Sequence, residues 1–135
     1  MIALDTSVVV AALLGWHEAH EPARQAANGG AIPAHALLES YSVLTRLPAP
    51  HRVAPDVASS LLAGWFPSER ILLPGSGLVR SIVDRLAEAG IGGGAAYDAL
   101  VGLTAAEHGA ELRTRDQRAA VTYDALSVPY RLVTT

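Results

Sequence analysis

The sequence contains no cysteine and no lysine. The lack of cysteine excludes disulfide bonds, thiolate metal ligands and a cysteine nucleophile, and it favours a reducing compartment. The lack of lysine excludes every mechanism that depends on a lysine amine. The longest early apolar run, Val8 to Leu14, is far shorter than the roughly 20 residues that a membrane-spanning helix needs. We therefore expect a cytoplasmic protein with no membrane association.

The size and composition fit one globular unit. The chain has 135 residues, half of them hydrophobic, which is enough for a single core, and we expect one domain spanning residues 1–135. The formal net charge is -3, so the surface as a whole does not favour binding of a polyanion. If the protein acts on nucleic acid, it needs a local source of positive charge, and bound divalent cations can supply one.

The pattern of apolar residues predicts strands that alternate with helices. Short apolar runs bounded by turn residues favour strands, and apolar positions at helical spacing favour helices. Near the start of the chain, Thr6 and Ser7 are suitable N-caps ahead of a helix. Strands are expected at 1–4, 31–34, 70–73, 110–113 and 129–133, and helices at 8–14, 17–28, 35–47, 55–66, 79–89, 95–108 and 115–126.

This alternation predicts an α/β fold. Strand, helix, strand units give a mostly parallel central sheet with helices on both faces, a three-layer α/β/α sandwich. In such folds ligands bind beyond the carboxyl ends of the strands, so the residues that directly follow strands are the first candidates for a site. Asp5 and Asp116 occupy such positions after the first and fourth strands.

Four of the thirteen acidic residues stand out. Asp5 and Asp116 follow strands, Glu39 interrupts an otherwise apolar helix, and Asp98 lies one turn into a helix after a glycine-rich break. Each also has a purely structural explanation: capping for Asp5 and Asp116, solvent exposure for Glu39, and the helix dipole for Asp98. The other nine fall on polar faces or in first turns.

Together the four acids indicate a metal site. Carboxylates gathered in one crevice repel one another, and their pKa values rise unless cations hold them. Oxygen-only ligands favour Mg²⁺ or Mn²⁺. A metal held this way would activate water for hydrolysis, with no cysteine, lysine or other side-chain nucleophile needed.

The segments around these acids resemble the PIN-domain nucleases, and more narrowly the VapC-type toxins of bacterial toxin-antitoxin pairs. The resemblance spans essentially the whole chain. It rests on Ile2-Ala3-Leu4-Asp5-Thr6-Ser7, a helical Glu39 after the second strand, Tyr97-Asp98-Ala99, and Leu112-Arg113-Thr114-Arg115-Asp116. The resemblance implies a metal-dependent endoribonuclease, with Asp5, Glu39, Asp98 and Asp116 as the catalytic, metal-binding acids.

Further residues and partners follow from the same resemblance. It implies that hydroxyls at Thr6 and Thr114 orient the ligands. Gln117 and Arg118 stand where many relatives have another acid or an Asn, so the number of metals, one or two, stays open. Arg115 and Arg118 are candidates for contact with the RNA backbone. Relatives of this type bind a small VapB-like antitoxin and commonly form homodimers, so we expect both here.

Two other functions remain open at this point. The first is a noncatalytic PIN-like module that binds RNA or protein. The second is a Mg-dependent phosphatase of the haloacid-dehalogenase type, which would need a second acid where Ser7 stands.

Two short motifs resemble known binding motifs but do not meet their requirements. His17-Glu18-Ala19-His20 lacks the spacing of a zinc protease motif, and Gly90 to Ala95 lacks the strand that must precede a dinucleotide-binding loop.

Overall fold

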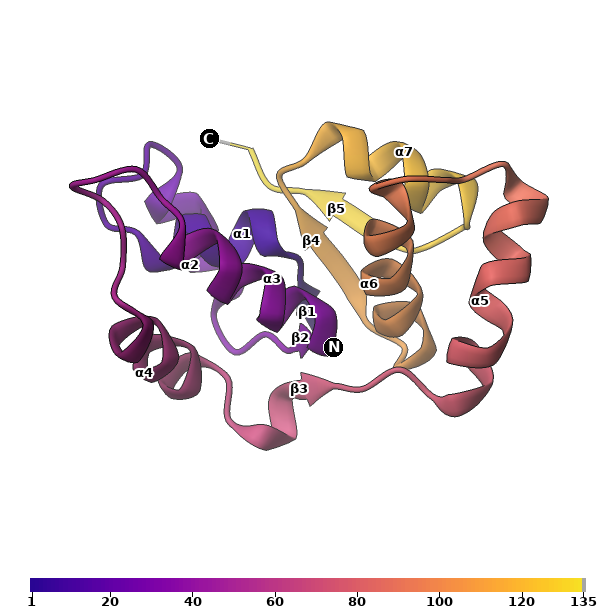
Figure 1. Cartoon of the computed structure of the whole chain (residues 1–135), viewed down its shortest axis with the longest axis horizontal. Helices are drawn as coiled ribbons and strands as arrows, with labels where there is room; N and C mark the ends of the chain where they lie inside the picture. Colours follow the sequence, from indigo (N-terminus) through magenta and orange to yellow (C-terminus); the bar gives the residue numbers. More distant parts are fainter. Residues whose placement is uncertain (135) are drawn as a thin grey trace.

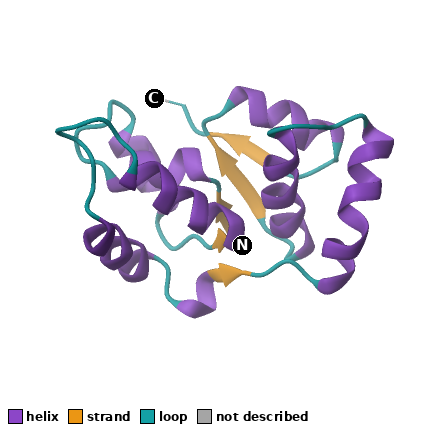
Figure 2. Cartoon of the chain, viewed as in Figure 1, coloured by secondary structure: helices purple, strands orange, loops and turns teal. Residues whose placement is uncertain are grey.

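The computed structural model describes residues 1–134. Its elements follow the predicted alternation of strands and helices (Figure 1, Figure 2). In chain order they are β1 (Ile2–Leu4), α1 (Thr6–Leu13), α2 (His20–Ala27), β2 (Ile32–Pro33), α3 (Ala34–Thr45), α4 (Pro55–Trp65), the 3-10 turn η1 (Ser68–Arg70), β3 (Ile71–Leu72), α5 (Ser76–Ala89), α6 (Ala95–Glu107), β4 (Glu111–Thr114), α7 (Gln117–Ala125) and β5 (Tyr130–Leu132).

All the strand pairings within residues 1–134 are parallel. β4 lies between β1 and β5, and β2 pairs with β3. A parallel bridge between Ala3 and Ala31 joins the two groups of strands, which gives the spatial order β3-β2-β1-β4-β5. In Figure 1, α1 to α4 lie on one side of β4 and α5 to α7 on the other. The predicted three-layer α/β/α fold with a mostly parallel sheet is confirmed.

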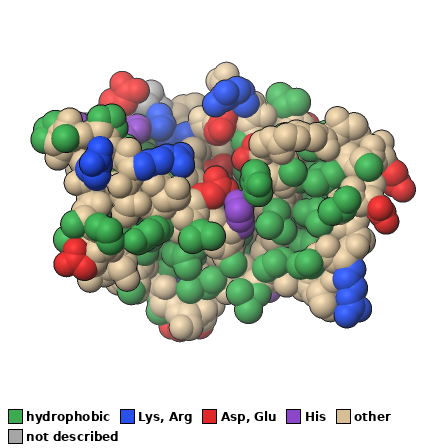
Figure 3. Space-filling view, viewed as in Figure 1, with side chains coloured by type: hydrophobic (Ala, Val, Ile, Leu, Met, Phe, Trp, Pro, Cys, Tyr) green, Lys and Arg blue, Asp and Glu red, His purple; other side chains and the backbone are tan. Residues whose placement is uncertain are grey.

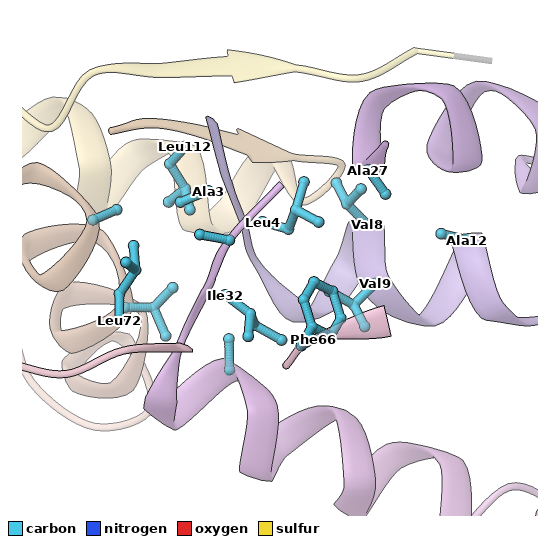
Figure 4. Packing of buried hydrophobic residues seen from close by; sticks show 14 of the residues in the cluster. Ala3, Leu4, Val8, Val9, Ala12, Ala27, Ile32, Phe66, Leu72 and Leu112 are labelled. Carbon is cyan, nitrogen blue, oxygen red and sulfur yellow. The ribbon is translucent and has the colours of Figure 1, made fainter. Parts of the chain in front are cut away.

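The core lies between the sheet and the helices. Leu4 of β1, Ile32 of β2 and Leu112 of β4 are fully buried at its centre, and Val8 and Phe66 pack against them from the helical side (Figure 4). Burying a side chain of this size contributes about 1.5 to 3 kcal/mol. These apolar residues fix the position of the strands, and therefore the position of whatever follows each strand.

Several predicted boundaries were wrong by one to three residues. The expected helices at 8–14 and 115–126 begin instead at Thr6 and Gln117, because the aspartates that directly precede them are the N-caps, and not Thr6 or Ser7. Helix α5 begins at Ser76 rather than at 79. The predicted strand at 70–73 is shortened to two residues because Arg70 ends the 3-10 turn.

One glycine controls how α7 packs on α6. A Cβ atom on Gly102 would lie 2.8 Å from Cδ1 of Tyr123, far closer than such contacts allow. The absence of a side chain at Gly102 therefore lets the Tyr123 ring lie directly against α6. Tyr123 is almost fully buried, and its hydroxyl reaches the aspartate that follows the first strand.

None of the helices within residues 1–134 is both long and apolar enough to cross a membrane.

Candidate active site

The sheet brings Asp5 and Asp116 to the same edge. Leu4 of β1 lies opposite Arg113 of β4 in parallel register, and the backbone N–H of Asp5 donates to the Arg113 carbonyl at 3.1 Å. Because the carboxyl ends of neighbouring parallel strands meet at one edge, the residues that follow them are neighbours. Asp5 comes directly after β1, and Asp116 follows β4 by two residues.

The helices bring the other two acids to the same place. Glu39 lies in the middle of α3 and Asp98 in the first turn of α6. Asp5, Glu39, Asp98 and Asp116 all line one cavity of about 320 Å³. Acidic side chains, with histidine beside them, are visible near the middle of the face shown in Figure 3. All four predicted acids are therefore brought together by the fold.

Asp5 is held by a dense set of hydrogen bonds. It is 5% exposed, and its Oδ1 accepts from the backbone N–H of Ser7 at 3.1 Å and from the Ser7 hydroxyl. Its Oδ2 accepts from the Tyr123 hydroxyl at 3.1 Å. Burial raises the pKa of Asp5, while hydrogen bonds from Ser7, Thr114 and Tyr123 oppose that rise. The carboxylate is thus fixed in orientation.

Asp116 is oriented by the helix that it begins. It is the N-cap of α7, and its Oδ1 accepts from the backbone N–H groups of Arg118 at 2.9 Å and Ala119 at 3.3 Å. Its own backbone N–H donates to the Thr114 hydroxyl at 3.0 Å. Asp5 and Asp116 therefore have both roles: each caps a helix, and each also lines the cavity.

Glu39 and Asp98 have fewer partners. Oε1 of Glu39 lies 3.1 Å from Nε2 of His35, one turn earlier on α3. Burial raises the pKa of Glu39, the charge of His35 lowers it, and that of Asp5 raises it again. Burial first, and then the charges of the other three acids, raise the pKa of Asp98 to about 6. Among residues 1–134 no hydrogen bond or ion pair to the Asp98 carboxylate is formed.

The donor set of this cavity fits a hard divalent cation, but the side chains are not yet arranged as ligands. The four carboxylates supply the hard oxygen donors that Mg²⁺ or Mn²⁺ prefers, and the imidazole of His17 also lines the cavity. Burial is the main cause of the raised pKa of Asp98, and the charges of the other three acids add to it. In the described part of the chain, no three Asp, Glu or His side chains are placed to hold one ion together. The Glu39 carboxylate would have to break its contact with His35 in order to bind the ion.

Of the two hydroxyls assigned by resemblance, the structure places one as expected and one differently. Thr114 is fully buried between Asp116 and Ser7. Thr6 instead points to the carbonyl of Ala36 at 3.4 Å. The adjacent Ser7 takes the expected place, since its hydroxyl donates to Asp5 and accepts from the backbone N–H of Arg115 at 2.8 Å.

Sequence reasoning also missed Tyr123. Its hydroxyl donates to Asp5, and burial, followed by the charge of Asp5, raises the pKa of the phenol well above its usual value. The phenol therefore stays protonated at physiological pH and donates a hydrogen bond to the carboxylate. No local pattern signals this pairing, because the two residues are 118 positions apart.

The two arginine candidates differ sharply. Arg115 lines the cavity, and its Nε is buried without a hydrogen-bond partner among residues 1–134. The Arg118 side chain is 97% exposed and lies 4.0 Å from Asp116. His17 also lines the cavity. Burial first, and then the charge of Arg115, lower the pKa of His17, so a neutral imidazole and a guanidinium form part of one wall.

The fold and this acid-lined cavity define a PIN domain. The PIN-domain family model matches residues 2–125, and the chain belongs to this family. The resemblance seen in the sequence is thereby confirmed.

Named relatives narrow the class to VapC-type proteins. The chain is 52% identical over 135 residues to Ribonuclease VapC40 of Mycobacterium tuberculosis, covering 99% of this chain and all of that one. It is 47% identical over 129 residues to Ribonuclease VapC27 of the same organism, covering 94% and 93% of the two chains.

Solved structures share the fold at lower identity. One is described as the structure of FitAB bound to an IR36 DNA fragment, with a TM-score of 0.71, 20% identity, and coverage of 98% of this chain and 94% of that one. Another is the crystal structure of FitAcB from Neisseria gonorrhoeae, with a TM-score of 0.66, 19% identity and coverage of 96% of both chains. These likenesses support the architecture.

Proposed function

We propose that this protein is a metal-dependent endoribonuclease, the toxin of a type II toxin-antitoxin pair. The observation that carries the proposal is the meeting of Asp5, Glu39, Asp98 and Asp116 in one cavity of a PIN domain. The names of the relatives that cover the whole chain, Ribonuclease VapC40 and VapC27, support RNA as the substrate.

The proposed cofactor is Mg²⁺ or Mn²⁺, and all four acids are its candidate ligands. A bound divalent cation lowers the pKa of water to make a nucleophile and stabilises the negative charge that builds up on the phosphate. Asp5 and Asp116 supply carboxylates whose directions the chain already fixes. Glu39 and Asp98 supply charge that can reorient, because neither carboxylate accepts a backbone hydrogen bond in the described residues.

The chain's own side chains would position the substrate. Ser7 and Tyr123 hold Asp5 in place through their hydrogen bonds, and the Thr114 hydroxyl in turn contacts that of Ser7. Arg115 lines the cavity, so its guanidinium is the candidate to contact an RNA phosphate there. Arg118 is a weaker candidate for backbone contact, since its side chain is almost fully exposed to solvent and an exposed arginine holds a phosphate loosely.

A cleavage assay tests this proposal against both alternatives. The protein is incubated with a structured RNA, with an unstructured RNA and with p-nitrophenyl phosphate, in Mg²⁺, in Mn²⁺ and in EDTA. We expect RNA fragments with metal only and no release of nitrophenol. Cleavage that persists in EDTA would contradict the metal dependence. Intact RNA under every condition would favour a noncatalytic module, and nitrophenol release would favour a phosphatase.

Two variants sharpen this assay. Asp98→Asn keeps the shape of the side chain and removes its charge, and we expect it to lower the cleavage rate at least about 100-fold. Asp56→Asn is the matched control, because Asp56 is an exposed acid in the first turn of α4, outside the cavity. It should cleave as the unchanged protein does.

The proposed partners are a VapB-like antitoxin and a second copy of this chain. A basic side chain of an antitoxin can pair with the carboxylates of the cavity and so compete with the metal. Co-expression with the product of the neighbouring gene should give a complex that no longer cleaves RNA. Sedimentation of the isolated chain should show a homodimer. A lack of any such complex, or a monomer at all concentrations, would remove the corresponding part of the proposal.

A further inference from the structure

An exposed aromatic residue stands beside the cavity. Tyr97 directly precedes Asp98 on α6, and it is 58% exposed. An exposed aromatic side chain is common and by itself needs no explanation. Tyr97 differs because its ring has a stacking partner: it lies parallel to the His35 ring of α3, with ring centroids 5.2 Å apart and planes inclined by 6°.

The stack is anchored to one of the four acids. Nε2 of His35 lies 3.1 Å from Oε1 of Glu39, and Glu39 lines the cavity. The orientation of the imidazole is therefore set from one side by the carboxylate and from the other by Tyr97. The stack connects α3 to α6 across the edge of the cavity, next to Glu39 and Asp98.

The geometry leaves an open aromatic surface. His35 lies parallel to the Tyr97 ring and offset from it, and more than half of the Tyr97 residue is exposed to solvent. A flat ring whose plane is already fixed binds another flat ring without the entropic cost of ordering itself. Such a surface suits a ligand that has a flat aromatic face and that lies close to the carboxylates.

We propose that Tyr97, backed by His35, is a stacking platform for an unpaired nucleobase of the RNA, adjacent to the phosphate that is cleaved. This inference rests on the proposed function. Proteins recognise single-stranded RNA mainly by stacking splayed-out bases on aromatic side chains, and this contact tolerates any base. The cleaved phosphate must lie beside the cation that the four carboxylates would hold, so a base of the same or the next nucleotide is the flat group nearest to Tyr97.

The platform implies a preference for unpaired RNA. A base inside a duplex has both faces covered by its neighbours, so it cannot stack on Tyr97 without being pulled out of the helix. Cleavage should therefore fall in loops, bulges or single-stranded segments. Because stacking does not read the edges of a base, it contributes little discrimination among the four bases at that position.

Binding measurements with substituted proteins test the platform. They use a fluorescently labelled single-stranded RNA, Mg²⁺ and an Asp98→Asn background that binds without cutting. We expect Tyr97→Leu to weaken binding about 5- to 150-fold, the range for loss of one stacked base. Tyr97→Phe and Tyr97→Trp should bind like the background protein. His35→Ala should bind more weakly than the background, because the ring that supports Tyr97 is lost.

A matched control and a matched substrate complete the experiment. Val83→Ala, at a 71% exposed position on α5, should leave binding unchanged. RNAs that lack one base at a time should show one position where losing the base weakens binding to the Asp98→Asn protein. When the protein also carries Tyr97→Leu, removing that base from the RNA should not weaken binding any further, because both changes remove the same contact.

The outcomes separate this inference from the proposed function. If the unchanged protein cleaves RNA with metal, but Tyr97→Leu binds every RNA as tightly as the background does, the platform alone is wrong. If Tyr97→Phe binds as weakly as Tyr97→Leu, the hydroxyl and not the ring makes the contact, and the platform is again wrong. A Tyr97→Leu protein that loses only its binding to an antitoxin would also overturn the platform. If no form of the protein binds or cleaves RNA, both proposals fail.

Discussion

The four acids of the cavity form two pairs that the chain treats differently. Asp5 and Asp116 follow strands, and each caps the helix that comes next, so backbone N–H groups fix their carboxylates. Glu39 and Asp98 project from within α3 and α6, where neither carboxylate accepts a backbone hydrogen bond among the described residues. Glu39 has His35 as a partner.

The two pairs therefore contribute differently: the capping pair stabilises the fold, and the helical pair mainly supplies charge to the cavity. The capping pair satisfies helix N-termini, so its carboxylates stabilise the fold whether or not a cation is bound. The helical pair is half-buried, and burial together with the charges of neighbouring acids raises the pKa of both residues; burial also raises the pKa of Asp5, but hydrogen bonds to its carboxylate oppose that rise. We expect the loss of a capping acid to weaken the fold, and the loss of a helical acid to leave the fold intact or strengthen it.

The largest expected effect on stability comes from Asp5→Ala. This substitution removes an N-cap and leaves the buried Tyr123 hydroxyl and Ser7 without their acceptor. The free energy of unfolding should fall by roughly 2 to 4 kcal/mol. Urea denaturation measures the change, with Asp98→Ala as the paired variant. A loss from Asp98→Ala as large as that from Asp5→Ala would refute the division into two pairs.

A smaller effect is expected from the hydroxyl that supports the capping pair. Ser7→Ala leaves the partly buried backbone N–H of Arg115 without its acceptor, which should cost about 1 to 2 kcal/mol. Thr6→Ala removes only a long contact to the Ala36 carbonyl, so its cost should stay within about 0.5 kcal/mol. Thermal melts of both variants measure the difference. Equal losses would show that Ser7 has no special role.

The smallest effect concerns pH and the helical pair. The pKa of Asp98 is raised from 3.8 to about 6 in the folded protein. A raised folded-state pKa favours the protonated folded form, so its contribution to stability is complete below about pH 4 and is lost as the pH rises through about 6. Asp98→Asn removes the charge. In EDTA its melting temperature should match the unchanged protein near pH 4 and exceed it by about 2 to 5 °C above pH 6.

Added Mg²⁺ provides the control for this pH experiment. A cation relieves the repulsion among the carboxylates, so it should raise the melting temperature of the unchanged protein more than that of Asp98→Asn. An Asp98→Asn protein that melts below the unchanged protein in EDTA at pH 8 would contradict the raised pKa.

The order of the elements and the four acids were predictable from the sequence because their signals are local. An acid after a short apolar run, or inside an apolar helix, is visible without a structure. The same holds for the break at Gly90 to Gly94, which sets where α6 begins. The exact bounds were less predictable because strands of two to four residues give almost no periodicity to count.

The support around Asp5 was not predictable, for two physical reasons. Thr6 and Ser7 are adjacent hydroxyls, and which one faces the carboxylate depends on where the helix begins, since successive residues rotate by about 100° around its axis. Tyr123 reaches Asp5 only because Gly102 lets its ring lie against α6. That contact is set by tertiary packing. The stack of His35 on Tyr97 likewise joins two helices that are distant in the chain.

The most direct test of the account is a titration of the protein with Mn²⁺, followed by the loss of the free-ion signal in electron paramagnetic resonance. The central claim is that four acids, distant in sequence, act as one cation site. We predict that the unchanged protein and Asp56→Asn bind Mn²⁺ equally, while Glu39→Gln and Asp98→Asn each bind it at least about 10-fold more weakly. Equal binding by all four proteins would contradict the claim.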